Sequence, residues 1–416
     1  SRFRLEHAVP PSLARPLVIA IALMLATPTF AADFTITAAD GTETTPQTLT
    51  GTAGSNTGVV ETGGTLTVGA GLDAITATGP DNTITNSGSI TGGSEGIASA
   101  GDDVTITNNG TITSTNNDGI YSSGTDATIT NSGTTNGGED GIQSVGGGST
   151  IINSGIINST LDNGIESNGT GNTITNSGTI DAADDGIFSN GSNAIITNSR
   201  TINGGEDGID SSGDDAIITN TNSGTINADY GIYSTGDNAT ITNSGTIDAA
   251  DDGIYSVGAN SIINNSGTIT ANQAVRGGVA DGLTLNLLKG SQLMGAIDLR
   301  GAGDNDTVNI HGGSVSATLT LLNTENINLL GPGLKLSGDV VAVSVDGTAD
   351  AARSVVLSTI TSDIHDQIAQ RIHLPAAPQP VKAVTSTVLP GLQFKQHKPV
   401  AWLQVLGGDS DRDAED

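Results

Sequence analysis

The sequence is poor in cysteine, aromatic residues and basic residues. It has no Cys, one Trp, four Tyr and five Phe in 416 residues, and its 14 Lys and Arg are outnumbered by 44 Asp and Glu, for a net charge of −30. The lack of Cys excludes disulfide scaffolds, thiolate zinc sites and cysteine nucleophiles. Residues 33–275 contain a single base, Arg200, so we expect no nucleic-acid partner, because phosphate contacts need Lys and Arg. So few aromatic rings cannot fill several compact cores, which leaves a regular core of aliphatic side chains.

Residues 1–31 have the pattern of a secretory signal peptide. Three arginines precede the apolar run PLVIAIALMLA at residues 16–26, and the small residues Ala31 and Ala32 follow it. A basic segment, a short apolar segment and small residues before a cleavage site are typical of such a peptide. The apolar run is shorter than the ~20 residues that a helix needs to cross a bilayer. We therefore expect an exported chain.

A unit of 22 or 23 residues is repeated along the middle of the chain. Two landmarks keep this period, the Gly of Asn-Ser-Gly and the Gly of Asp-Gly-Ile. The second landmark falls at Gly96, Gly119, Gly141, Gly164, Gly186, Gly208, Gly231 and Gly253. A short fixed period is typical of solenoids, in which each unit packs on its neighbours.

Three isoleucine columns recur within the unit, beginning at Ile84, Ile90 and Ile97, and Thr135 interrupts the second. Each Ile lies in a short Thr-rich segment bounded by Gly, Asn and Asp, which predicts three short strands per unit. One such unit buries too little apolar surface to offset its ordering entropy, so the units must stack. The predicted fold class is all-β, a right-handed parallel β-helix of coils of about 22 residues, followed by a short α-helix and a linker.

An asparagine column accompanies the isoleucines and runs from Asn86 to Asn265. Stacked inside a corner, each amide could donate to and accept from its neighbours along the axis. The Gly two residues after each Asn is expected to provide the positive φ that such a corner needs. Arg200 departs from this pattern, and the extra residues Thr221 and Asn222 predict a small bulge.

Disorder is the competing interpretation, since Gly- and Asn-rich polar segments often remain unfolded. The register of the isoleucines and the absence of Pro between residues 81 and 331 argue against it. The predicted segments are a signal peptide (1–31), an N-terminal cap (32–80), regular β-helix repeats (81–275), Leu-rich C-terminal β-helix coils (276–356), an amphipathic helix with a Pro-containing linker (357–400) and a final strand (401–416).

The C-terminal part of the chain has a helical rhythm followed by a strand. Ile360, Ile364, Ile368 and Ile372 recur every four residues and Pro375 ends the pattern, which predicts an amphipathic helix over residues 358–373. The alternating sequence AWLQVLGG then predicts a strand at residues 401–408.

The order of these segments resembles the type V autotransporters of Gram-negative bacteria. The shared features are a signal peptide, an Asn-Ser-Gly-rich β-helix, the segments DNDTVN (304–309) and NTENINL (323–329), a helix with a linker, and a Trp-x-Gln-x-x-Gly-Gly strand. That strand is similar to the first strand of the family's translocator barrel, although Leu406 stands where Phe is usual. The barrel is truncated here, since its other strands would follow Asp416.

The resemblance implies a destination and a role. It implies export through the periplasm to the outer membrane or cell surface of a Gram-negative bacterium. It implies a surface-displayed, non-catalytic passenger, that is, an adhesin-like or structural rod. The implied partners are the outer membrane, through the missing barrel, and glycans or proteins on host or bacterial surfaces.

A column of acids precedes the Gly-Ile pairs, at Glu95, Asp118, Asp140, Asp185, Asp207 and Asp252. Carboxylates ~4.8 Å apart repel one another, and a bound divalent cation would relieve this repulsion. Asn163 and Tyr230 interrupt the column, and Asp is common in polar turns, so a solvated turn is the default interpretation and no cofactor is expected.

A second weak metal signal lies at residues 301–308, which resemble one calcium-binding nonapeptide. Such sites need consecutive copies, and the chain has one. If the chain holds a metal ion, we expect Ca²⁺, with ligands among Asp140, Asp185, Asp207, Asp304 and Asp306.

Two outward patterns are open to a binding interpretation. The position after the third Ile carries Tyr121, Phe188, Tyr233 and Tyr255 among acids, which could form a sugar-binding face, but packing on neighbouring coils explains these rings more simply. Thr-x-Thr pairs recur in the first strand of the unit and could order water, as on ice-binding β-helices. Three pairs are broken by Ile, so ordinary strand propensity is the better explanation.

Catalysis has little support in the sequence. All five His lie outside the repeats, so no Ser-His-Asp set is evident there. The length of the unit barely varies, which leaves no long loops to wall a cleft. We expect no enzyme. The alternative is a secreted β-helix enzyme that acts on polysaccharide as a lyase or hydrolase, through Asp, Lys or Arg in a cleft.

Overall fold

The structure is a computed structural model that describes residues 33–50, 55–279, 282–300, 305–311, 317–331, 334–337 and 340–343. All of these residues belong to one compact unit of the chain, Ser1–Ser354. The expected signal peptide, C-terminal helix, linker and final strand lie outside the described residues. The division of the chain into segments therefore stays a prediction.

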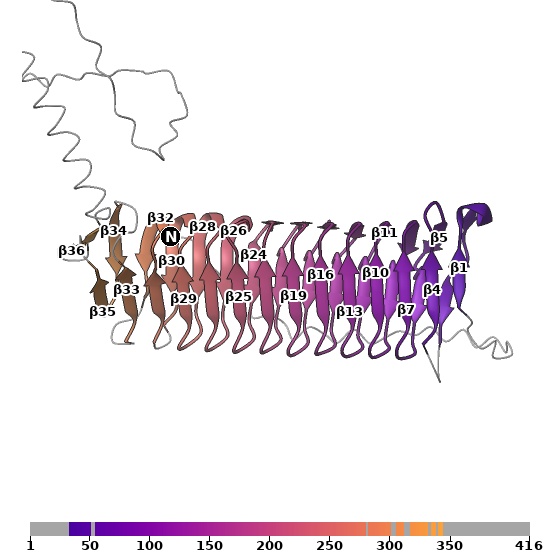
Figure 1. The fold of residues 1–416 in the computed structure, drawn as a ribbon, viewed down its shortest axis with the longest axis horizontal. Coiled ribbons are helices and arrows are strands. Elements are labelled where there is room, and N and C mark those ends of the chain that lie inside the picture. The colour runs from indigo at the N-terminus through magenta and orange to yellow at the C-terminus, as the bar shows by residue number, and fades with distance from the viewer. Residues whose placement is uncertain are drawn as a thin grey trace, which may run out of the picture. The chain divides into compact units, whose positions relative to one another are not determined.

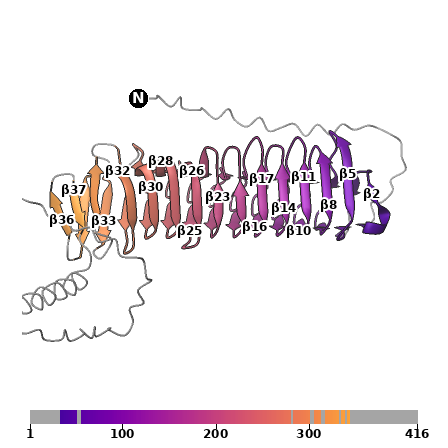
Figure 2. The same cartoon turned by 90° about the horizontal axis from the view of Figure 1, so that it is seen from above.

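The described chain forms a parallel β-solenoid, as the repeat predicted (Figures 1 and 2). Each coil places its first strand in sheet A, where successive strands pair in parallel and in register, Thr with Thr and Ile with Ile. From β7 to β33 the first strand starts every 22 or 23 residues. The strands of sheet A are β1 (Phe34–Ile36), β4 (Thr57–Val60), β7 (Thr83–Asn86), β10 (Thr105–Asn108), β13 (Thr128–Asn131), β16 (Thr150–Asn153), β19 (Thr173–Asn176), β22 (Ile195–Asn198), β25 (Ile217–Asn220), β27 (Thr240–Asn243), β29 (Ile262–Asn265), β31 (Thr284–Leu287), β33 (Thr307–His311) and β35 (Asn326–Leu330).

The second and third strands of each coil form sheet B, again by parallel pairing with the next coil. The second strands are β2 (Thr42–Glu43), β5 (Thr65–Ala70), β8 (Ser89–Gly93), β11 (Thr111–Ser114), β14 (Thr134–Gly137), β17 (Ile156–Ser159), β20 (Thr179–Asp181) and β23 (Thr201–Asn203). The third strands are β3 (Gln47–Leu49), β6 (Ile75–Ala77), β9 (Ile97–Ser99), β12 (Ile120–Ser122), β15 (Ile142–Ser144), β18 (Ile165–Ser167), β21 (Ile187–Ser189) and β24 (Asp207–Ser211). In later coils the two merge into β26 (Thr225–Ser234), β28 (Thr246–Ser256), β30 (Thr268–Gly277) and β32 (Gln292–Asp298).

The two ends of the solenoid differ from its middle. At the N-terminal end β1 pairs with β4 in the ordinary parallel way, and a 3-10 turn, η1 (Ala38–Asp40), follows with a capping box from Thr37. At the C-terminal end the pairing becomes antiparallel among β34 (Ala317–Leu322), β36 (Leu334–Ser337) and β37 (Val340–Val343). The sequence predicted only further coils there, because Leu-rich strands do not reveal the direction of their pairing.

The core consists of the isoleucine columns. Every Ile of the three columns between residues 84 and 269 is fully buried. Strand residues alternate inward and outward, as in the burial pattern of β10, so the inward face of sheet A carries Ile and Asn. A further inward column, of serine, was not predicted, although its Ile-x-Ser signature recurs along the repeats: Ser99, Ser122, Ser144, Ser167, Ser189, Ser211, Ser234 and Ser256.

The predicted asparagine column is confirmed as a hydrogen-bonded ladder inside the corner after sheet A. Each side-chain Nδ2 donates to the Oδ1 of the next coil at 2.8 or 2.9 Å. The last Nδ2, of Asn265, donates to Ser291 Oγ at 2.6 Å. The members are Asn86, Asn108, Asn131, Asn153, Asn176, Asn198, Asn220, Asn243 and Asn265, all fully buried.

The prediction of positive φ at the glycines of this corner is wrong. None of them has a positive φ. They are glycines because coils approach closely here: a Cβ added to Gly133 would lie 2.0 Å from the carbonyl O of Gly110. Arg200 stands at an exposed point of this column, and the corner widens in the coil that follows, where Gly224 comes four residues after its Asn rather than two.

Positive φ is needed at a different corner, before each strand of sheet A. Asp or Asn adopts φ between 56° and 59° there in most coils, at Asp81, Asp103, Asp126, Asn193, Asp215, Asn238 and Asn260. Asn305 (φ 65°) and three glycines complete the column, Gly148 (φ 74°), Gly171 (φ 75°) and Gly282 (φ 89°). Asp, Asn and Gly tolerate the left-handed region best, which explains why this turn is polar.

Candidate functional site

The acid column predicted from the sequence is a ladder on the corner between the second and third strands. Each side-chain oxygen accepts a hydrogen bond from the backbone N–H of the corresponding residue in the next coil, at 2.7 to 3.3 Å. We call this set the acidic ladder; its members are Asp73, Glu95, Asp118, Asp140, Asn163, Asp185 and Asp207. Asp73 was missed because Ala replaces the Gly of its Asp-Gly-Ile signature.

The hydrogen bonds explain why the ladder tolerates one interruption and not the other. Asn163 keeps an acceptor oxygen, and its Oδ1 accepts from the N–H of Asp185 at 3.3 Å. Tyr230 has no acceptor in that place, and its own N–H donates to the backbone O of Glu206 at 2.9 Å. The register of β26 and β28 shifts between Ala228 and Tyr230. The ladder therefore has a structural role in holding the corner, whatever else it does.

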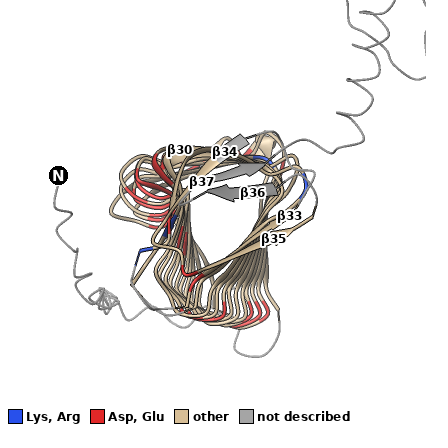
Figure 3. Ribbon diagram, turned by 90° about the vertical axis from the view of Figure 1, so that its left-hand side faces the viewer, with Lys and Arg blue, Asp and Glu red and all other residues tan. Residues whose placement is uncertain are grey.

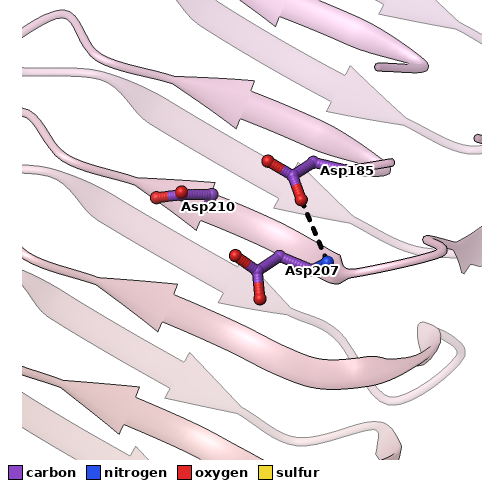
Figure 4. A group of neighbouring side chains, drawn as sticks. All are labelled: Asp185, Asp207 and Asp210. Carbon is purple, nitrogen blue, oxygen red and sulfur yellow. Dashed lines mark hydrogen bonds between the residues drawn. The ribbon is translucent and has the colours of Figure 1, made fainter. Parts of the chain in front are cut away.

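Three carboxylates meet at one end of the ladder, those of Asp185, Asp207 and Asp210 (Figure 4). One oxygen of each lies within 4.8 Å of the others, and Asp185 Oδ1 accepts from the N–H of Asp207 at 3.0 Å. Asp185 and Asp207 are buried, and Asp210 is half-buried. Two of these were predicted metal candidates. Asp210 was not one of them; it is one of the acids at the outward position after the third Ile, which also carries Tyr121 and Phe188. Parallel pairing of β21 and β24 sets Asp210 beside Phe188 and close to the ladder.

The remaining metal candidates are not brought to this group. Asp140 lies two coils away, beyond Asn163, where its Oδ2 accepts from Gln143 Nε2 at 3.0 Å. Asp306 is buried on the other side of the solenoid and its Oδ1 accepts from the N–H of Leu283 at 2.8 Å. Asp304 lies outside the described residues. The structure thus assembles two of the five predicted ligands.

Burial shifts the proton equilibria of the ladder. It raises the pKa of Asp118 to about 8, and the charge of Glu95 adds to the effect. It raises the pKa of Asp185 to about 8 as well, with the charge of Asp210 as the next cause. The pKa of Asp140 is raised by burial and then by its hydrogen bond with Glu166 and the charge of that group. Each cause disfavours the ionised carboxylate.

Raised pKa values bear directly on what the group of three carboxylates can do. A proton on Asp185 relieves the repulsion that a cation would otherwise relieve. Proton and divalent cation therefore compete for this group, and a hard cation such as Ca²⁺ must displace the proton of Asp185 in order to bind its oxygen. At neutral pH burial favours the protonated form of Asp185, whose pKa is raised to about 8.

Of the four aromatic residues that follow the third Ile, Tyr233 and Tyr255 contact one another across adjacent coils. The rings of Tyr233 and Tyr255 have centroids 5.1 Å apart at 35°. The guanidinium of Arg276 lies 4.2 Å from the centroid of the Tyr255 ring, and its Nη1 is 2.7 Å from Asp252 Oδ2. Arg276 was missed because it follows Val275, which replaces the Ile of the third column. Its ion pair neutralises the Asp252 position, where burial raises the carboxyl pKa and Arg276 lowers it.

The acidic residues are unevenly distributed around the solenoid. Viewed along the solenoid, the acidic residues gather at the corners and the strands of sheet A, such as β33 and β35, are free of them (Figure 3). Among the residues that the structure describes, no helix has the length and apolar character to span a membrane.

No protein-family model, curated protein or solved structure matches this chain. Its likeness to the autotransporters therefore consists of the parallel β-solenoid and of the sequence features described above.

Proposed function

We propose that the chain is the passenger of a type V autotransporter, a surface-displayed, non-catalytic rod with an adhesin-like or structural role. The observation that carries the proposal is the constant coil length, since the first strand restarts every 22 or 23 residues from β7 to β33. Coils of one length produce long, even lateral surfaces and no walls around a cleft. Such surfaces suit extended contact with another surface rather than enclosure of a small substrate.

The chemistry of the rod fits a passenger. Its core and ladders are made of Ile, Asn and Asp contacts between one coil and the next, so a chain emerging from a pore can fold coil by coil. It has no Cys that could be trapped as a disulfide on the way. Its partners are proposed to be the outer membrane, through a translocator barrel, and glycans or proteins of host or bacterial surfaces.

Surface display is tested on intact cells that carry the complete gene. An antibody raised against the purified chain should label these cells before permeabilisation, and added protease should remove the label. Labelling that appears only after permeabilisation would overturn the proposal. Sequencing beyond the codon for Asp416 is the companion test: alternating strands of about ten residues should follow, whereas an immediate stop codon would contradict display by the chain's own barrel.

A secreted polysaccharide-acting enzyme remains the second candidate because of one observation, the group formed by Asp185, Asp207 and Asp210. Pairs of carboxylates also carry glycoside hydrolysis. Asp185 and Asp207 are only 7% and 2% exposed, which leaves a sugar little access to them. Release of reducing ends from acidic or neutral polysaccharides, lost in the variant Asp210→Asn, would favour the enzyme; no release would favour the rod.

A further inference from the structure

The outer face of sheet A differs from the rest of the rod because it carries no charge. We consider the eleven strands β4, β7, β10, β13, β16, β19, β22, β25, β27, β29 and β31, each of which has two outward residues. These 22 residues comprise 15 Thr, four Ile, one Val and two Asn. We call them the sheet A face. In a chain with a net charge of −30, a face without an acid is a specific feature.

The sheet A face is also where isoleucine is exposed. Five Ile are exposed in the described residues, and four of them lie on this face: Ile152, Ile195, Ile217 and Ile262, at 37 to 45% exposure. They replace Thr in the two outward columns, so the face is β-branched at 20 of its 22 positions. Burial of these methyl groups against a partner would be favourable, whereas strand propensity alone does not require Ile over Thr at a solvated position.

We propose that the sheet A face docks a second copy of this chain, so that two rods pack side by side, sheet on sheet. This names a partner for the proposed rod, but the packing follows from the face itself and holds for the chain in solution whether or not it is displayed on a cell.

Area and repeat favour a second copy as the occupant. Eleven strands ~4.8 Å apart and about 13 Å long cover about 700 Å² per copy, or about 1,400 Å² in total, which lies within the range of specific interfaces. Only another coil stack repeats its side chains at the same spacing, so each Thr or Ile row can fit between two rows of the partner along the whole length. A partner without this repeat would match a few rows.

Charge favours the same choice of face. The acids of the rod gather at some of its corners (Figure 3). They lie in the turn before sheet A, for example at Asp102 and Asp237, and on the acidic ladder. Two rods that met through the turn before sheet A or through the acidic ladder would bring like charges together, which costs several kcal/mol per close pair. The sheet A face is a long surface without acids on which two copies can approach without that repulsion, and it carries four of the five exposed Ile of the described residues.

The experiment places charge on the sheet A face of the full chain and compares it with a matched change on sheet B. Thr197→Glu with Thr219→Glu alters two half-buried, outward threonines that are partners in adjacent coils. Thr179→Glu with Thr201→Glu alters an equivalent pair on sheet B. The molar mass of each protein is measured by sedimentation equilibrium across the micromolar range, and circular dichroism melts confirm that both variants fold.

We expect the unaltered chain and the sheet B variant to form dimers, and the dissociation constant of the sheet A variant to rise roughly tenfold or more. A chain that is monomeric throughout, or a sheet A variant that dimerises as well as the sheet B variant, would overturn the inference.

A second measurement avoids charge and depends on the absence of native Cys. The thiol of Thr219→Cys should react more slowly with a charged reagent as the protein concentration rises, while that of Thr201→Cys should react at a constant rate. Equal concentration dependence of the two thiols would contradict docking through sheet A. Neither measurement depends on surface display, so a failure here is distinguishable from a failure of the proposed function.

Discussion

The asparagine ladder predicts that the loss of stability on mutation depends on how many ladder hydrogen bonds are removed. Asn153 lies in the middle of the ladder: its Oδ1 accepts from Asn131 Nδ2 at 2.8 Å, and its own Nδ2 donates to Asn176 Oδ1 at 2.8 Å. Asn86 lies at the end of the ladder, where the residue paired with it in the preceding coil is Val60. Asn153→Ala therefore removes two ladder bonds and Asn86→Ala removes one.

The size of the destabilisation depends on which hydrogen bonds the neighbouring asparagines retain. After Asn153→Ala, Asn131 Nδ2 still donates to the backbone O of Ile156 at 2.9 Å, and Asn176 Oδ1 still accepts from the N–H of Gly178 at 3.2 Å. No full desolvation penalty is added at these two atoms. Two ladder bonds of about 1 kcal/mol each and a small cavity give about 3 kcal/mol of destabilisation. Each Asn also loses one bond to a backbone O and one from a Gly N–H, Thr179 and Gly155 for Asn153 and Thr111 and Gly88 for Asn86, so these losses are common to both changes. One bond fewer gives about 2 kcal/mol for Asn86→Ala.

The assay is urea unfolding of the full chain, followed by the strand signal in circular dichroism. Midpoints are compared at constant slope, so that differences report stability rather than a change in the unfolded state. Ser154→Ala, a change at an exposed neighbour on the same corner, is the control and should cost less than about 0.5 kcal/mol. Equal losses for Asn153→Ala and Asn86→Ala would refute the reasoning, because the two changes would then act through cavity and local turn effects alone.

Three further predictions concern the acids and the close-packed corner. Because the pKa values of Asp118 and Asp185 are raised to about 8 in the fold, their stabilising effect is complete below about pH 4 and is lost as the pH rises to 8, so urea midpoints should fall over that range. Gly133→Ala should cost at least about 3 kcal/mol, since the new Cβ meets a backbone oxygen at 2.0 Å. Arg276→Met should lower the thermal midpoint more at pH 8 than at pH 5, because it removes the cation that is paired with the buried carboxylate of Asp252.

Each of these has its own control. In the double variant Asp118→Asn with Asp185→Asn, the urea midpoint should depend less on pH. An unchanged dependence would assign the effect to other acids. Gly171→Ala is the control for Gly133→Ala. A Cβ at Gly171 meets nothing within 4 Å, so its loss of stability comes only from the positive φ of 75°. For Arg276, equal losses at the two pH values would indicate that only its packing on Tyr255 matters.

The fold was predictable because the same residue pattern, and with it the same contact, recurs in every repeat. An Ile that recurs at the same place in every unit can be buried only if the units stack, and stacking in register places Asn on Asn. A single Ile or Asn in an irregular chain would carry no such information. The missed serine column was available in the same way, as Ile-x-Ser along the repeats.

The composition of the sites was predictable, but their grouping was not. The period of the repeat predicted that Asp185 and Asp207 lie one coil apart in the same column. It placed Asp210 in another column, and only the parallel register of β21 with β24 brings its carboxylate within 4.8 Å of the other two. The distance between two columns depends on how sharply the corner turns, and no periodicity encodes that angle.

What the sequence by itself determined is the axial order of the rod: which residues repeat, which face inward, and which stack on their own kind in the next coil. The contacts and backbone conformations of the corners were decided only by the tertiary structure. It decided that the Asn-Ser-Gly glycines are needed for close approach rather than for positive φ, that the left-handed residues are the Asp and Asn before sheet A, and that Arg276 lies on Tyr255 and pairs with Asp252. The physical reason is that contacts along the axis join equivalent residues, whereas contacts across it depend on the backbone torsions of the corners, which the period of the repeat does not encode.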